Sequence, residues 1–102
     1  MAKITSKQNE LLRDSRQKVS PKIYSLLLHL VNDNREDLAE MVLKIDYLIE
    51  YANNSIKAKD KEEAKEALQK AEERMKFLKR ENVDLTHLQY LIDGVKKKGL
   101  NN

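Results

Sequence analysis

The sequence has no cysteine, and it has only two glycines and one proline among 102 residues. The absence of cysteine excludes disulfide frameworks, thiolate zinc sites and cysteine nucleophiles. So little glycine and proline leaves too few turn residues for a fold built from many short strands. We therefore expect an all-α protein.

Long apolar runs are also missing. The longest run, residues 26–31, is interrupted by His29 and is far shorter than the roughly 20 residues needed to cross a bilayer. The first ten residues contain neither an apolar leader nor a cleavage-site pattern. We expect a cytoplasmic protein with no transmembrane segment.

The length and the apolar fraction of 40% suit one small domain. We expect an antiparallel bundle of four main helices with an additional N-terminal helix. The expected single domain covers residues 1–102, with a peripheral N-terminal helix within residues 1–19, a bundle core over 20–99 and a short tail at 100–102. The expected helices span residues 6–18, 21–31, 35–58, 61–81 and 85–98.

Capping residues mark where these helices begin. Ser20 followed by Pro21 combines a preferred N-cap with a residue that needs no amide partner in the first turn. Asp33 with Glu36 three residues later resembles a capping box, and Asp60 with Glu63 repeats the pattern. Asp84 is expected to begin the last helix, and Gly99 is expected to follow its end as the C′ residue.

Apolar spacing predicts which faces are buried. The helix at 21–31 is apolar on nearly every side, so we expect it in the middle of the bundle. The next two helices carry heptad-spaced apolar seams, and the short link between them predicts an antiparallel hairpin. The seam residues are Leu38, Val42, Ile45, Ile49, Ala52 and Ile56, followed by Ala64, Leu68, Ala71, Met75 and Leu78.

A second apolar stripe runs along the helix at 35–58, opposite its seam. Leu43, Tyr47 and Tyr51 are spaced by four residues, and Phe77 is a further aromatic displaced from the core positions of the next helix. This stripe either packs inside the chain or forms a dimer or partner interface, for which tyrosine is well suited. We name these four residues as the candidate interface.

The net charge of +3 comes from basic ends around an acidic centre. Residues 1–22 carry six basic and two acidic side chains, whereas residues 33–60 carry four and seven. If the termini meet, their cations form a surface for an acidic protein, an anionic membrane or nucleic acid. Nucleic acid is the least favoured of these, because no recognition motif accompanies the charges. The candidate basic surface comprises Arg13, Arg16, Lys18, Lys22, Lys96, Lys97 and Lys98.

Catalytic and metal-binding patterns are missing from the sequence. It has no glycine-rich phosphate loop, no nucleophile elbow and no glutamate-x-x-histidine pairs. The two histidines, His29 and His87, are isolated in sequence and fit structural roles. We expect no enzymatic activity, no metal and no cofactor.

The leading interpretation is a non-enzymatic interaction protein, such as an adaptor, chaperone or inhibitor. It is expected to bind another protein through a helical face and to form a homodimer. In size, charge and expected architecture, the chain also resembles the bacteriocin immunity proteins of Gram-positive bacteria. That resemblance implies protection of a membrane permease from inside the cell, with peripheral membrane contact. A regulator that binds nucleic acid weakly is the third alternative.

Overall fold

The structure, a computed structural model, describes residues 19–99, and these residues form four helices joined by short turns. The helices are α2 (Pro21–Asn32), α3 (Glu36–Lys57), α4 (Lys61–Arg80) and α5 (Thr86–Gly99). The predicted all-α class is confirmed for this part of the chain, and each helix boundary lies within one residue of its predicted position. The helix expected at 6–18 and the tail at 100–102 lie outside the described residues.

The chain divides into two compact units. The first unit ends at Leu43 and the second begins at Lys44, so α3 contributes residues to both. The proposed boundaries at residues 19 and 99 within a single domain stay predictions. Within residues 19–99, no helix is both long enough and apolar enough to cross a membrane.

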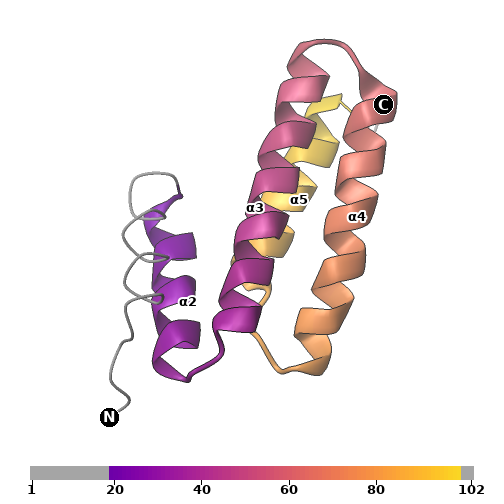
Figure 1. Cartoon of the computed structure of the whole chain (residues 1–102). Helices are drawn as coiled ribbons and strands as arrows, with labels where there is room; N and C mark the ends of the chain where they lie inside the picture. Colours follow the sequence, from indigo (N-terminus) through magenta and orange to yellow (C-terminus); the bar gives the residue numbers. More distant parts are fainter. Residues whose placement is uncertain (1–18, 100–102) are drawn as a thin grey trace. The chain divides into compact units, whose positions relative to one another are not determined.

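In the first unit, α2 lies antiparallel to the beginning of α3 (Figure 1). The buried side chains there are Ile23, Leu27, Leu30, Val31, Leu38, Ala39 and Val42. Although α2 is apolar on nearly every side, its buried residues form one stripe at helical spacing, and its expected place in the middle of the bundle stays a prediction. Leu28 lies off that stripe and is 37% exposed.

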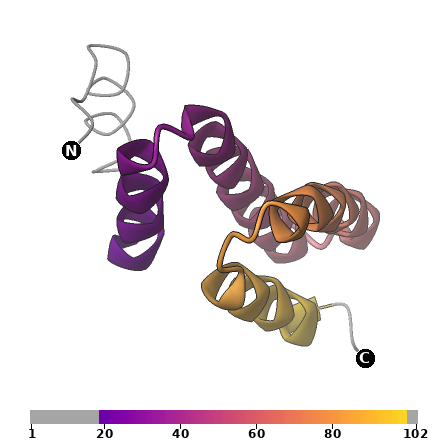
Figure 2. The same cartoon turned by 90° about the horizontal axis from the view of Figure 1, so that it is seen from below.

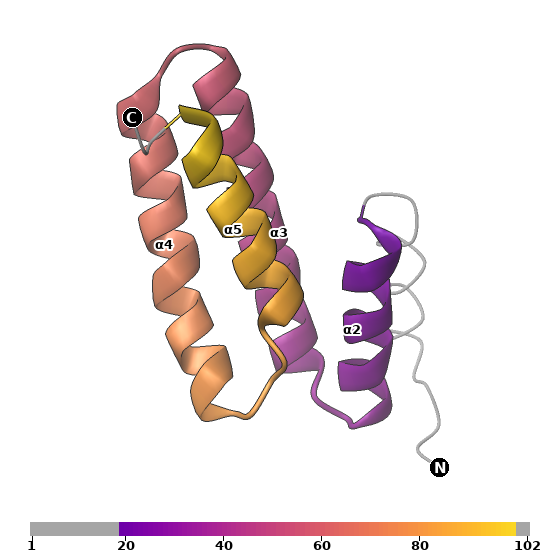
Figure 3. The same cartoon turned by 180° about the vertical axis from the view of Figure 1, so that it is seen from behind.

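In the second unit, the remainder of α3 and the whole of α4 form an antiparallel hairpin, and α5 lies against one side of it (Figures 2 and 3). The heptad seams are confirmed, except that Ile56 is only half-buried. Alanines at three of the buried α4 positions allow its axis to approach its neighbours closely. The buried side chains of this unit are Ile45, Ile49, Ala52, Ala64, Ala67, Leu68, Ala71, Met75, Leu78, Leu88, Ile92 and Val95.

Two of the predicted N-caps are confirmed by hydrogen bonds. Ser20 Oγ accepts from the Ile23 amide at 3.4 Å, and Asp60 Oδ1 accepts from the Glu63 amide at 3.1 Å. Each bond satisfies an amide that has no partner within its helix. The last helix begins at Thr86, one residue later than expected, and Asp84 Oδ1 accepts from the Thr86 amide at 3.0 Å.

The prediction that Asp33 begins α3 is wrong. Asp33 is the C-cap of α2, and its backbone N–H donates to the carbonyls of the last turn of that helix. The α3 helix begins at Glu36, and the Ala39 amide donates to the Arg35 carbonyl at 3.1 Å. Arg35 also pairs with Asp37 at 3.1 Å. Aspartate suits both ends of a turn between two helices. The spacing from Asp33 to Glu36 therefore did not show which of the two helices Asp33 caps.

Three helices end in the same left-handed turn without using glycine. Asn34, Lys59 and Asn82 have φ values of 60°, 65° and 62° and follow α2, α3 and α4 respectively. At each turn the next amide donates to the carbonyl five residues earlier, as Asp60 does to Ser55 at 2.8 Å. This is the Schellman pattern, which satisfies carbonyls that the helix leaves unpaired. Asparagine tolerates this conformation, but for lysine it is unfavourable.

We predict that Lys59→Gly raises the free energy of unfolding by about 1 kcal/mol, because glycine adopts a positive φ without a Cβ clash. Ala58→Gly is the control, since Ala58 has no positive φ and gains nothing from the change. Chemical denaturation followed by circular dichroism measures both. A stability for Lys59→Gly equal to or below that of the parent would contradict the left-handed turn.

The two glycines have different surroundings, and both lie in α5. A Cβ added at Gly94 meets nothing within 4 Å, whereas one at Gly99 lies 2.7 Å from Ile56 Cγ2. Gly99 is the last residue of α5 and has no positive φ, so its expected role as a left-handed C′ residue is wrong. Its position is explained by the close approach of α5 to α3 at Ile56.

The two alanine variants should therefore change stability in opposite directions. Gly94→Ala should stabilise the fold by about 1 kcal/mol through helix propensity. Gly99→Ala should destabilise it by about 1 to 3 kcal/mol, because a methyl group there overlaps Ile56. Urea unfolding of both variants beside the parent tests this, and a destabilised Gly94→Ala would show that this position is packed.

Candidate functional site

Two of the predicted interface residues, Tyr47 and Tyr51, lie side by side on α3. Tyr47 is 66% exposed and Tyr51 is 41% exposed, and their ring centroids are 6.5 Å apart. We call these two residues the tyrosine face. Phe77 is 40% exposed and lies on α4. Leu43 is half-buried and belongs to the first unit, so we do not include it in this face.

Tyr51 is held in place by the α3–α4 hairpin. Its hydroxyl donates a hydrogen bond to Glu63 Oε2 at 2.8 Å, and its backbone carbonyl accepts one from Ser55 Oγ at 2.9 Å. The hydrogen bond to Glu63, together with the negative charge of that carboxylate, raises the pKa of Tyr51. The hydrogen bond to Glu63 therefore joins the exposed ring of Tyr51 to α4.

The candidate basic surface is only partly described. Lys96 Nζ lies 3.2 Å from Glu72 Oε1, and Lys98 Nζ donates to Asn53 Oδ1 at 3.2 Å. Both interactions join α5 to the other helices of the second unit. Lys97 and Lys22 are exposed, and they belong to different units. The remaining members of this surface, Arg13, Arg16 and Lys18, lie outside the described residues.

The two histidines lie apart from any metal-binding arrangement. His29 is exposed, with Nε2 3.4 Å from Asp33 Oδ2. His87 stacks on Tyr90 at a centroid distance of 6.2 Å, and its Nε2 is buried with no hydrogen-bond partner. Across residues 19–99, no three histidine, aspartate or glutamate side chains are grouped as metal ligands.

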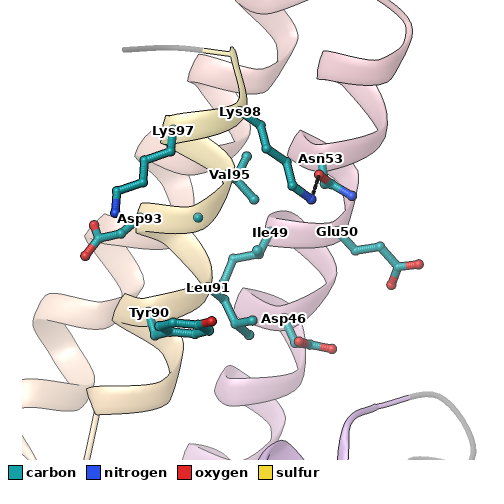
Figure 4. Close-up of a pocket in the computed structure, with 11 residues that line it drawn as sticks. Asp46, Ile49, Glu50, Asn53, Tyr90, Leu91, Asp93, Val95, Lys97 and Lys98 are labelled. Atoms are coloured by element: carbon teal, nitrogen blue, oxygen red, sulfur yellow. Dashed lines mark hydrogen bonds between the residues drawn. The ribbon is translucent and has the colours of Figure 1, made fainter.

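A groove between α3 and α5 was not predicted from the sequence. The groove is open to solvent and has a volume of about 600 Å³. Ile49, Leu91 and Val95 line its centre, and carboxylates and lysines surround them (Figure 4). Leu91 is half-buried and lines this groove. The remaining lining residues are Asp46, Glu50, Asn53, Tyr90, Asp93, Gly94, Lys97 and Lys98.

Asp46 is a half-buried carboxylate of the groove. Burial raises its pKa, and the negative charge of Glu50, one turn further along α3, raises it further. A folded-state pKa above the unfolded value of 3.8 means that the folded chain holds this proton more tightly. The free energy of unfolding therefore falls as the pH rises from 3.8 through the raised folded-state pKa of Asp46, and this loss is complete at neutral pH.

We predict that Asp46→Asn stabilises the fold at pH 7, by no more than about 0.5 kcal/mol because the side chain is only half-buried. The gain should disappear below pH 3.8, where the parent residue is also neutral. Asp93→Asn, at an exposed carboxylate of the same groove, is the control. Denaturant unfolding at several pH values measures the difference, and a destabilised Asp46→Asn at pH 7 would contradict the assignment.

Comparisons with known proteins give no family for this chain. No protein-family model matches it, and neither the curated proteins nor the solved structures give a significant match.

Proposed function

We propose that this chain is a non-enzymatic interaction module of the cytoplasm, and that its tyrosine face pairs two copies into a homodimer. The observation that carries this proposal is the exposure of Tyr47 and Tyr51 next to one another on a single helix. Tyrosine is enriched at protein interfaces because it combines a large apolar ring with a polar tip.

The spacing of the two rings suits a two-fold dimer. In a symmetric interface, the same patch of both subunits meets itself. If two α3 helices cross antiparallel at this face, Tyr47 of each copy lies opposite Tyr51 of the other. The hydrogen bond from Tyr51 to Glu63 fixes that ring in advance. Less side-chain entropy is then lost when the interface forms.

Two further observations support a binding role over catalysis. Asp46 neighbours another carboxylate, and within residues 19–99 no hydrogen bond or ion pair joins it to a histidine, serine or lysine as a nucleophile–base pair would require. The lysines at the end of α5 also have structural roles, because Lys96 and Lys98 each contact a residue of another helix. The immunity-like and nucleic-acid alternatives need those cations for their ligand, and both stay predictions.

The decisive measurement is sedimentation velocity on the parent and on Tyr47→Ala/Tyr51→Ala. We expect a dimeric parent and a monomeric variant whose helicity, measured by circular dichroism, is unchanged. Both side chains are exposed, so their removal leaves the buried core intact.

Leu28→Ala serves as the matched control, because Leu28 is an exposed apolar residue on a different helix. It should sediment as the parent does. A monomeric parent, or a double variant that stays dimeric, would overturn the proposed pairing.

A further inference from the structure

We propose that the groove between α3 and α5 binds a basic amphipathic helix of a partner protein. Apolar side chains of that helix would lie on Ile49, Leu91 and Val95, and its lysines or arginines would lie beside Asp46 and Glu50. This inference rests on the proposed role as an interaction module, and it names the partner's chemistry. It concerns a different surface from the tyrosine face.

The shape and lining of the groove suit a helix. Its two walls are themselves helices, and the half-buried Leu91 lies between them with Ile49 and Val95, each of which is 5% exposed (Figure 4). An amphipathic helix binds such a surface with side chains spaced by three or four residues. Tyr90 adds an exposed aromatic ring at one end of the same groove.

The charges on the α3 wall specify a cationic occupant. Asp46 and Glu50 are one helical turn apart, and neither forms an ion pair with another side chain in residues 19–99. The lysine of α5 that reaches towards α3, Lys98, donates to Asn53 instead. Lys97 and Lys98 also line the groove, but among residues 19–99 neither is paired with Asp46 or Glu50, so the two carboxylates beside the apolar surface are open to a cation. A lysine or arginine from a partner would supply it and relieve their repulsion.

Gly94 supplies an independent observation at the same groove. It lies in the interior of α5, where glycine lowers helix stability by about 1 kcal/mol relative to alanine. No neighbouring atom explains it, because a Cβ there meets nothing within 4 Å. The missing side chain leaves the α5 backbone open to close approach from the groove. Asp46 and Gly94 both lower the stability of the fold, and both line one surface, as is typical of binding sites.

The test uses fluorescence anisotropy with two labelled synthetic helical peptides. The first has leucine at heptad positions a and d and lysine at the remaining positions. The second replaces every lysine with glutamate. We expect the full-length protein to bind the lysine peptide at least about tenfold more tightly than the glutamate peptide, and to lose affinity as salt is added.

Three variants locate the binding. Asp46→Asn/Glu50→Gln should lower the affinity for the lysine peptide by about tenfold. Gly94→Leu should abolish binding because its side chain fills the groove. Glu66→Gln/Glu73→Gln removes the same amount of charge from exposed positions on α4, and it should bind as the parent does. If Gly94→Leu does not fold, Gly94→Ala replaces it. That variant should be more stable than the parent and still bind more weakly.

Several outcomes would overturn the inference. The first is equal affinity for the two peptides. The second is an equal loss of peptide affinity in Asp46→Asn/Glu50→Gln and in Glu66→Gln/Glu73→Gln. The third is undiminished peptide binding by a folded Gly94→Leu. The result is separable from the proposed dimer, because Tyr47→Ala/Tyr51→Ala should bind the lysine peptide normally. A monomeric parent that binds the lysine peptide would contradict the proposed dimer and support the proposed binding groove.

Discussion

The buried seam of α3 is the contact on which the second unit depends. Ile45, Ile49 and Ala52 are buried on α3, and α3 is the helix that lies beside both α4 and α5 (Figure 2). Small residues set the distances between the helix axes. Alanines on α4 and Gly99 at the end of α5 allow helix axes to come close, and the contact at Ile56 leaves no room for a methyl group.

Much of the fold could be predicted from the sequence because helix starts and apolar faces are local properties. Ser20 and Asp60 act through residues three positions away, and heptad spacing is visible in any single helix. Asp33 was misassigned because aspartate occurs at both ends of turns. The left-handed turns at Asn34, Lys59 and Asn82 were missed because none of them contains glycine, the residue that usually marks such a position.

The candidate sites could be predicted only in part, because they depend on how the helices pack against one another. Four-residue spacing identified Tyr47 and Tyr51 as neighbours on one helix, but the hydrogen bond to Glu63 depends on how α3 and α4 are aligned in the hairpin. The groove is harder still to predict, because its walls come from helices separated by the whole of α4. The one signal of the groove in the sequence is Gly94, a glycine that lies inside a helix where no turn or cap requires it.

The turns between the helices also bear on how a partner reaches these surfaces. Each turn in the described part of the chain spans a few residues, and hydrogen bonds to the preceding helix hold its backbone. None of them is long enough to fold over a ligand as a lid. Within residues 19–99 no turn covers the helical walls of the groove, so binding there should follow single-step kinetics, with no gating phase before association. Association rate constants should then fall in the range typical of rigid docking, about 10⁵ to 10⁷ M⁻¹s⁻¹.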